Sequence, residues 1–189
     1  MTRNDEFYTL PSDLPVPLDD GGCEHLAGMR VPAIALISTS GRRVDLADIA
    51  FERAVIYCYP RTGVPGRGVP KGWDQIPGAR GCTPESCGFR DHYEELRGLK
   101  TQVFGLSTQG SDYQQEMVAR LRLPFEVLSD ADFKFTDALH LPTFEFDGVR
   151  LLRRLTLVLS KGKIDKVFYP VFPPDKHAKE VVLWLSQHR

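Results

Sequence analysis

Net charge, long apolar runs and cysteine are all scarce in this sequence of 189 residues. The 24 basic residues are balanced by 25 acidic ones, so no basic excess exists to neutralise phosphates, which argues against nucleic-acid binding. No apolar run approaches the roughly 20 residues that cross a bilayer, which argues against a membrane-spanning protein. The N-terminal stretch carries several acidic side chains and no continuous apolar segment, so we expect no signal peptide and a cytoplasmic protein.

The chain has only four cysteines: Cys23, Cys58, Cys82 and Cys87. Cytosolic thiols are kept reduced, so a stabilising disulfide framework is not expected. Four thiols still allow metal binding or catalysis, and we look for the chemistry of the protein among them. Cys58 lies within a strand-like apolar stretch and is predicted to be a buried, inert thiol. Cys23 is predicted to be incidental.

The composition is that of a folded protein, with 42% hydrophobic and 26% charged residues. We divide the chain into an N-terminal arm, residues 1–30, and a single domain, residues 31–189. The arm is polar and rich in proline and glycine, and we interpret it as an extended segment or a short helix laid on the domain.

Strand and helix patterns alternate along the domain. The predicted order is a hairpin (33–37 and 42–46), a central strand (54–59), a long loop (60–81), a helix after Cys82, a strand (103–106), a helix (112–121), a strand (125–128), a helix (131–139), a hairpin (154–159 and 164–168) and a final helix opened by Pro173-Pro174. Thr83 is predicted to cap the first helix, because Pro84 suits the first helical position. The alternation predicts a mixed α/β sheet with helices on both faces.

The loop at residues 60–81 has an unusual composition, with four prolines and six glycines in 22 residues, so regular structure is not expected. A loop of this length in a compact domain is more often functional than idle. Trp73 either lines a substrate entrance or partner surface, or covers part of the core, and we favour the core. Arg67, Lys71 and Arg80 either add positive charge beside a thiolate or are solvated.

Cys82 directly precedes the predicted helix, where free backbone N–H groups and the helix dipole favour an anion. This position favours the thiolate, which is the nucleophilic form of cysteine. Position alone therefore makes Cys82 the best nucleophile candidate among the four cysteines.

Cys87 follows Cys82 by five residues, which on a helix means a turn of roughly 140° and an axial displacement of roughly 7.5 Å. A disulfide needs Cα atoms within about 7 Å and facing Cβ atoms, so the two cannot bond while this segment is helical. The pair is either a switch that requires unwinding, or Cys87 simply packs as a small hydrophobe. A zinc site is a weaker interpretation, because zinc ligand pairs usually follow C-x2-4-C spacing.

The segment GCTPESCGFRD, Gly81–Asp91, resembles the active-site segment of peroxiredoxins, and most closely that of the Q type, also called bacterioferritin comigratory protein. Tyr59-Pro60, Leu128–Asp130 and Arg154–Val158 resemble three further family motifs in the same order. The resemblance runs from about Ala33 to the C-terminus, and the cysteine segment is its most specific part.

The resemblance implies a thioredoxin-like fold and a thiol peroxidase without a cofactor or metal. It implies that Cys82 is the peroxidatic cysteine, whose thiolate attacks a hydroperoxide and becomes a sulfenic acid. Cys87 would be the resolving cysteine that closes an intramolecular disulfide, which a thioredoxin-type donor then reduces. Arg154 would stabilise the thiolate and the charge on the peroxide, Glu85 would orient Arg154, and Pro60 would shield the site from water.

The sequence departs from the family in the active-site loop. Peroxiredoxins carry Pro-x-x-x-(Thr/Ser)-x-x-Cys, so a motif that starts at Pro60 would place its cysteine at position 67, and Cys82 therefore follows an insertion of 15 residues. Thr62 is the only hydroxyl side chain between Pro60 and Gly81. We expect Thr62 to take the place of the family threonine from a displaced position.

Two other functions remain open at this point. One is a thiol–disulfide oxidoreductase or redox sensor on the same fold, although the usual C-x-x-C is absent. The other is a non-catalytic module that binds a partner through the loop and Trp73. For the peroxidase, we expect a hydroperoxide substrate, a thioredoxin-like reductant, and a monomer or homodimer.

Overall fold

The computed structural model describes residues 7–49, 52–63 and 66–188. Its strands are β1 (Ala35–Ser38), β2 (Arg43–Asp45), β3 (Arg53–Cys58), β4 (Thr101–Ser107), β5 (Val127–Ser129), β6 (Thr143–Phe146), β7 (Val149–Leu152), β8 (Leu155–Ser160) and β9 (Lys163–Phe168). Its α-helices are α1 (Cys82–Asp91), α2 (Tyr93–Gly98), α3 (Ser111–Leu121), α4 (Lys134–Ala138) and α5 (His177–Gln187), and two short 3₁₀ helices are η2 (Trp73–Gln75) and η3 (Pro174–Lys176).

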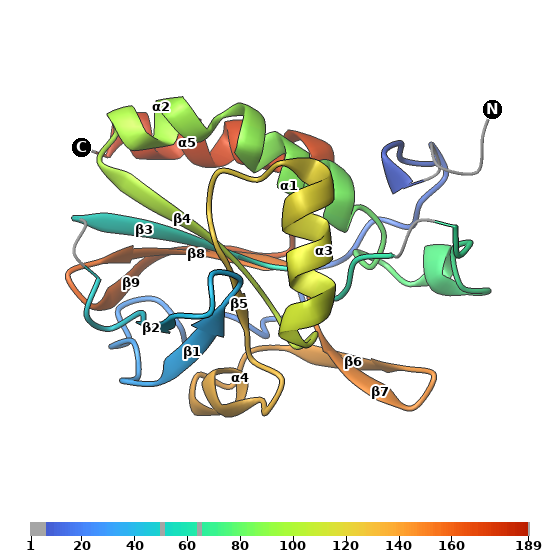
Figure 1. Ribbon diagram of the computed structural model, residues 1–189, viewed down its shortest axis with the longest axis horizontal. Coiled ribbons are helices and arrows are strands. Elements are labelled where there is room, and N and C mark those ends of the chain that lie inside the picture. The colour runs from blue at the N-terminus through green and yellow to red at the C-terminus, as the bar shows by residue number, and fades with distance from the viewer. Residues whose placement is uncertain (1–6, 50–51, 64–65, 189) are drawn as a thin grey trace.

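Seven strands form one sheet in the order β2-β1-β5-β4-β3-β8-β9, and β6 pairs with β7 in a separate hairpin (Figure 1). The pairs β3–β4 and β4–β5 are parallel, whereas the other pairs of the large sheet are antiparallel. The predicted mixed α/β sheet is therefore confirmed.

Apolar layers lie on both faces of the sheet because side chains alternate along each strand. Val55 and Tyr57 of β3 belong to the layer covered by α1, α2, α3 and α5. Ile56 and Cys58 belong to the opposite layer, where α4 and the end of the arm cover the sheet. In Figure 1, α2 and α5 lie above the sheet and α4 lies below it. The prediction of helices on both faces is confirmed.

Several elements differ from the prediction. Helix α4 is shorter than residues 131–139, because the Asp130 carboxylate accepts hydrogen bonds from the backbone N–H groups of Phe135 and Thr136, at 3.0 and 2.8 Å, and so fixes its first turn. The hairpin β6–β7 was not predicted, although Asp147-Gly148 at its turn is a strong hairpin signal and both residues have positive φ.

The arm and the long loop are both packed onto the domain. Cys23 and Leu26 of the arm are buried in the core, so Cys23 contributes to packing. The loop contains one 3₁₀ helix, η2, where no regular structure was expected, and its Trp73 is buried. Within the described part of the chain, no helix is long and apolar enough to span a membrane.

Candidate active site

Helix α1 begins at Cys82, and Gly81 allows it to begin there. Gly81 has a φ of 108°, a conformation that side-chain-bearing residues rarely adopt. A Cβ atom at this position would also lie 2.3 Å from Cγ of Pro174 in η3. The prediction of Thr83 as the N-cap is therefore wrong: Gly81 is the N-cap, and Pro84 occupies the third helical position, where its missing N–H breaks no helical hydrogen bond.

The Cys82 thiol faces a buried guanidinium. Nη2 of Arg154 lies 3.1 Å from Sγ of Cys82, and both side chains are almost fully buried. The register of the sheet brings them together, because Cys58 at the end of β3 pairs with Leu155, the residue after Arg154. A fixed positive charge and the N-terminus of α1 therefore meet at the same sulfur atom.

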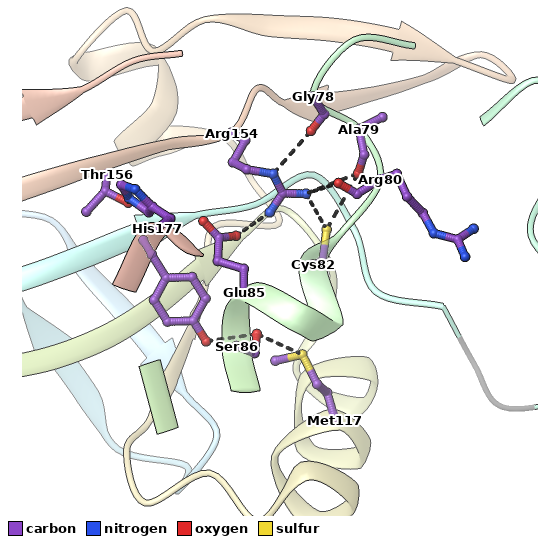
Figure 2. Close-up of polar contacts among 11 residues, drawn as sticks. Gly78, Ala79, Arg80, Cys82, Glu85, Ser86, Met117, Arg154, Thr156 and His177 are labelled. Carbon is purple, nitrogen blue, oxygen red and sulfur yellow. Dashed lines mark hydrogen bonds and ion pairs between the residues drawn. The ribbon is translucent and has the colours of Figure 1, made fainter. Parts of the chain in front are cut away.

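The guanidinium is held by backbone carbonyl groups from the end of the long loop (Figure 2). Nε donates to the carbonyl oxygen of Gly78 at 3.2 Å, and Nη2 donates to those of Ala79 and Arg80 at 3.1 and 3.2 Å. Burial lowers the pKa of Arg154, but the negative charges of Cys82 and Glu85 outweigh that effect and raise it. The guanidinium therefore stays charged, and its orientation depends on the conformation of residues 78–80.

Glu85 lies on the other side of the same guanidinium. Its Oε2 accepts a hydrogen bond from Nη1 of Arg154, and the Glu85 side chain is completely buried. Burial raises the pKa of Glu85, and the neighbouring Arg154 opposes the rise. Because Glu85 lies one helical turn after Cys82, helix α1 supplies both side chains that Arg154 contacts through its Nη atoms, beside the carbonyl groups of the loop.

The other cysteines lie in different surroundings. Cys87 is partly exposed on α1, and burial raises its pKa while nearby Arg90 opposes the rise. Burial raises the pKa of Cys58 well above its usual range and that of Cys23 to about 12. All four cysteines are free, and α1 is continuous from Cys82 past Cys87, so a bond between these two requires the start of α1 to unwind.

A cavity of about 540 Å³ opens beside Cys82. Thr62 lines it, and both its backbone N–H and its hydroxyl group donate to Oε1 of Gln109, at 2.8 and 3.2 Å. The hydroxyl therefore faces Gln109 and not the sulfur of Cys82. Pro60 is buried at the end of β3. Among the described residues, no group of three or more His, Cys, Asp or Glu side chains is placed to hold a metal ion.

Trp73 anchors the long loop to the β6–β7 hairpin. It packs with Ala79 and Leu151 in a small apolar cluster, and its ring lies 5.0 Å from that of Phe146 in an edge-on arrangement. The preference for a packing role is confirmed, and Trp73 also lines the cavity. The cluster joins the segment that holds Arg154 to the segment that carries it. Ala79 supplies a carbonyl group that accepts a hydrogen bond from Arg154, and Leu151 lies three residues before the arginine.

Comparison with known proteins identifies the family. The Redoxin family model matches residues 26–182. The chain is 31% identical to a chloroplastic peroxiredoxin Q of Sedum lineare over 84% of this chain and 77% of that protein, and 29% identical to peroxiredoxin Bcp of Escherichia coli K12 over 86% and 96%. The chain belongs to the Q-type peroxiredoxins.

Solved peroxiredoxin structures have the same fold. Peroxidoxin BcpB of Mycobacterium tuberculosis aligns with a TM-score of 0.71 at 24% identity, over 87% of this chain and 99% of that chain. Peroxiredoxin Q of Xanthomonas campestris aligns with a TM-score of 0.66 at 22% identity, over 94% and 99%. The thioredoxin-like fold expected from the resemblance is confirmed, and this peroxiredoxin is a thiol-dependent peroxidase that acts on peroxides with a thioredoxin-type reductant.

Some residues around the site of this peroxiredoxin were missed in the sequence. Gln109 lies just after β4, at the carboxyl end of a parallel strand, and that position was an available signal. No sequence pattern indicates that the carbonyl groups of Gly78, Ala79 and Arg80 accept hydrogen bonds from Arg154, because every residue has a backbone carbonyl group whatever its side chain. Arg61 stacks over Trp73, with Cζ 5.3 Å from the ring centre, and only the folded loop brings these two together.

Proposed function

We propose that Cys82 is the peroxidatic cysteine of this thiol-dependent peroxidase. The observation that carries the proposal is the 3.1 Å contact between Nη2 of Arg154 and Sγ of Cys82 at the first residue of α1. The thiolate attacks the terminal peroxide oxygen, the O–O bond breaks, and Cys82 becomes a sulfenic acid. The leaving oxygen takes up a proton and departs as water or an alcohol, so the thiol loses two electrons and the peroxide gains them.

Arg154 has two roles in this proposal. It stabilises the thiolate before the reaction, and it stabilises the negative charge that develops on the peroxide oxygens in the transition state. Glu85 is a positioning residue, since its buried carboxylate engages Nη1 and directs Nη2 towards the sulfur. Pro60 keeps water from the inner side of the site. Thr62 takes the place of the family threonine from the wall of the cavity, where its hydroxyl group donates to Gln109.

Cys87 is the proposed resolving cysteine. After the first turn of α1 unwinds, its thiol attacks the sulfenic sulfur of Cys82, the disulfide forms and water leaves. A thioredoxin-type dithiol then reduces the disulfide and becomes a disulfide itself. Partial exposure of Cys87 supports this role, because the unwound segment must reach both Cys82 and the donor.

The test uses the full chain with hydrogen peroxide and a thioredoxin system. The wild type should turn over repeatedly, and mass spectrometry of the oxidised protein should find a Cys82–Cys87 linkage. Cys87→Ser should react with one equivalent of peroxide, fail to recycle, and accumulate over-oxidised Cys82, because no thiol traps the sulfenic acid. A linkage between two chains, or one through Cys58, would remove the resolving role from Cys87.

The setting of the reaction is also part of the proposal. An intramolecular disulfide needs no second subunit, so we propose a monomer or a homodimer in which each chain acts by itself. Four free thiols fit a reducing compartment, and we propose the cytoplasm.

We further propose that residues 1–30 are an arm on a domain of residues 31–189. A structural report on a Xanthomonas campestris relative describes alkyl peroxide reduction, which supports organic hydroperoxides as substrates here.

A further inference from the structure

The charged side chains that line the cavity beside Cys82 are all positive among the described residues. Four arginines line it: Arg61, Arg67, Arg80 and Arg150. Among the described residues that line it there is no aspartate, glutamate or lysine. The whole chain has a formal net charge of −1, so this local excess of positive charge is not a consequence of composition. Such a concentration of one sign in a partly enclosed space attracts an anion.

Two of the four arginines already have carboxylate partners. Nη1 of Arg80 lies 3.1 Å from Oδ1 of Asp74, and Nη2 of Arg150 lies 2.8 Å from Oδ1 of Asp137. Figure 2 shows the Arg80 side chain extending away from the guanidinium of Arg154. Arg61 and Arg67 have no carboxylate within ion-pair distance among the residues that the structure describes, so their charges are available to a ligand.

Arg61 is also held in place for binding. Its guanidinium lies over the ring of Trp73, with Cζ 5.3 Å from the ring centre, and Trp73 is itself buried in the apolar cluster with Leu151. This cation–π contact restricts the guanidinium and lowers the entropy that is lost when it binds a carboxylate. Arg67 lines the same cavity and is exposed. Together they provide one fixed and one adaptable donor.

The cavity is much larger than hydrogen peroxide requires. Its volume of about 540 Å³ lies in the range of small-molecule sites, whereas one water molecule occupies about 30 Å³ of liquid. The lining also contains apolar side chains that suit a hydrocarbon body: Val69, Pro70, Tyr113, Phe133, Val149 and Leu151. The lining therefore suits a molecule with an apolar body and a negatively charged end.

We propose that the cavity binds organic hydroperoxides that carry a carboxylate, with the hydroperoxide at Cys82 and the carboxylate at Arg61 and Arg67. The inference rests on the proposed role of Cys82 as the peroxidatic cysteine. The carboxylate takes no part in the redox step: the thiolate takes the terminal oxygen, the two electrons pass to the substrate, and the substrate leaves as the alcohol with its carboxylate unchanged. Arg61 and Arg67 are thus residues that determine specificity, and Arg67 belongs to the insertion in the active-site loop.

The test compares matched pairs of substrates on the full chain. One pair is cumene hydroperoxide with a para-carboxylate and the same compound with a primary amide. The other pair is a linear ten-carbon hydroperoxide with a terminal carboxylate or a terminal amide. The two pairs differ in the distance between the hydroperoxide and the carboxylate, so the result does not depend on a single distance. The measured quantity is the second-order rate of Cys82 oxidation, by stopped-flow fluorescence without reductant, and the preference is the carboxylate rate divided by the amide rate.

The wild type should prefer the carboxylate of at least one pair by about tenfold, which is typical of one charge-assisted hydrogen bond. Arg61→Gln/Arg67→Gln should bring the preference to about one, and Arg61→Lys should give an intermediate value because it keeps the charge and loses the planar fork. The control Arg97→Gln removes an exposed arginine of α2 that does not line the cavity, and it should keep the wild-type preference.

Three results would overturn the proposal: no preference in the wild type for either pair, a preference that survives in the double variant, or an equal loss in Arg97→Gln, which would indicate long-range attraction and no binding site. Hydrogen peroxide carries no carboxylate, so its reduction by the wild type tests the role of Cys82 separately. Loss of reaction with every peroxide would refute that role, whereas loss of the preference alone refutes only the carboxylate site.

Discussion

Cys82 and Cys58 are both buried, with 4% and 0% of their surface exposed, yet their surroundings differ in charge. Cys58 lies in a layer of apolar side chains, and burial raises its pKa far above the usual range. Cys82 touches the Arg154 guanidinium at the N-terminus of a helix. The two thiols therefore share burial and differ in their neighbours, since a buried positive charge and a helix N-terminus lie beside Cys82 and not beside Cys58.

The largest expected effect separates the two thiols directly. Cys82→Ser should abolish peroxide reduction, because a hydroxyl group does not become an anion under the same influences, whereas Cys58→Ala should keep the wild-type rate per folded molecule. The measurement is peroxide consumption with a thioredoxin system. Turnover by Cys82→Ser, or its loss in Cys58→Ala, would remove the distinction drawn between these two environments.

The next effect tests the charge that distinguishes the two environments. Arg154→Lys keeps the charge but loses the planar fork, and its rate with peroxide at high pH should fall by about 10²-fold, as when a donor to a developing anion is removed. Arg154→Ala should be slower still. The pH at which its rate is half-maximal should also rise, because the thiolate loses its positive neighbour.

The control for the arginine variants is folding, since Arg154→Ala leaves Glu85 buried without its cation. Urea midpoints should be measured for both variants, and Arg154→Lys provides the kinetic result if the alanine variant is unfolded. Superimposable pH profiles for the wild type and both variants would mean that Arg154 is only a structural charge.

A smaller effect of distinct sign is expected at Glu85. Glu85→Gln removes a negative charge one helical turn from Cys82, so the pH of half-maximal rate should fall, in the direction opposite to Arg154→Ala. The plateau rate should decrease about tenfold, because a neutral amide orients the guanidinium less strongly than a carboxylate does. The measurement is the pH profile of the peroxide reaction. A slower plateau with an unmoved midpoint would reduce Glu85 to a packing residue.

The smallest effect on rate is expected at Trp73. Trp73→Ala should destabilise the fold by about 3 kcal/mol as a large-to-small change in an apolar cluster. It should also lower the plateau rate severalfold, because the cluster fixes the loop whose carbonyl groups hold Arg154. The matched control is Trp184→Ala on α5, which should lose stability without a change in the rate of folded protein. Equal rate losses in both variants would contradict the link from Trp73 to Arg154.

Much of the fold could be predicted because it depends on local patterns. The apolar stretch at residues 54–59 predicts the central strand, and the alternation of strands and helices predicts the sheet layers. The helix start was misplaced by two residues because Thr83-Pro84 is a common capping pair, whereas Gly81 has a positive φ and leaves no room for a Cβ atom beside Pro174. The contacts of Arg154 have no local signal in the sequence, because its partners lie 69 to 76 residues away.

The sequence by itself pointed to Cys82 as the candidate nucleophile, because GCTPESCGFRD places it at the start of a helix, where backbone N–H groups favour an anion. The tertiary structure alone decided which groups surround its sulfur atom. The carbonyl groups of residues 78–80 that hold Arg154, the reach of Thr62 to Gln109, and the stacking of Arg61 on Trp73 all join distant segments or use backbone atoms. Such contacts leave no local pattern, because loop closure and sheet register create them only in the folded chain.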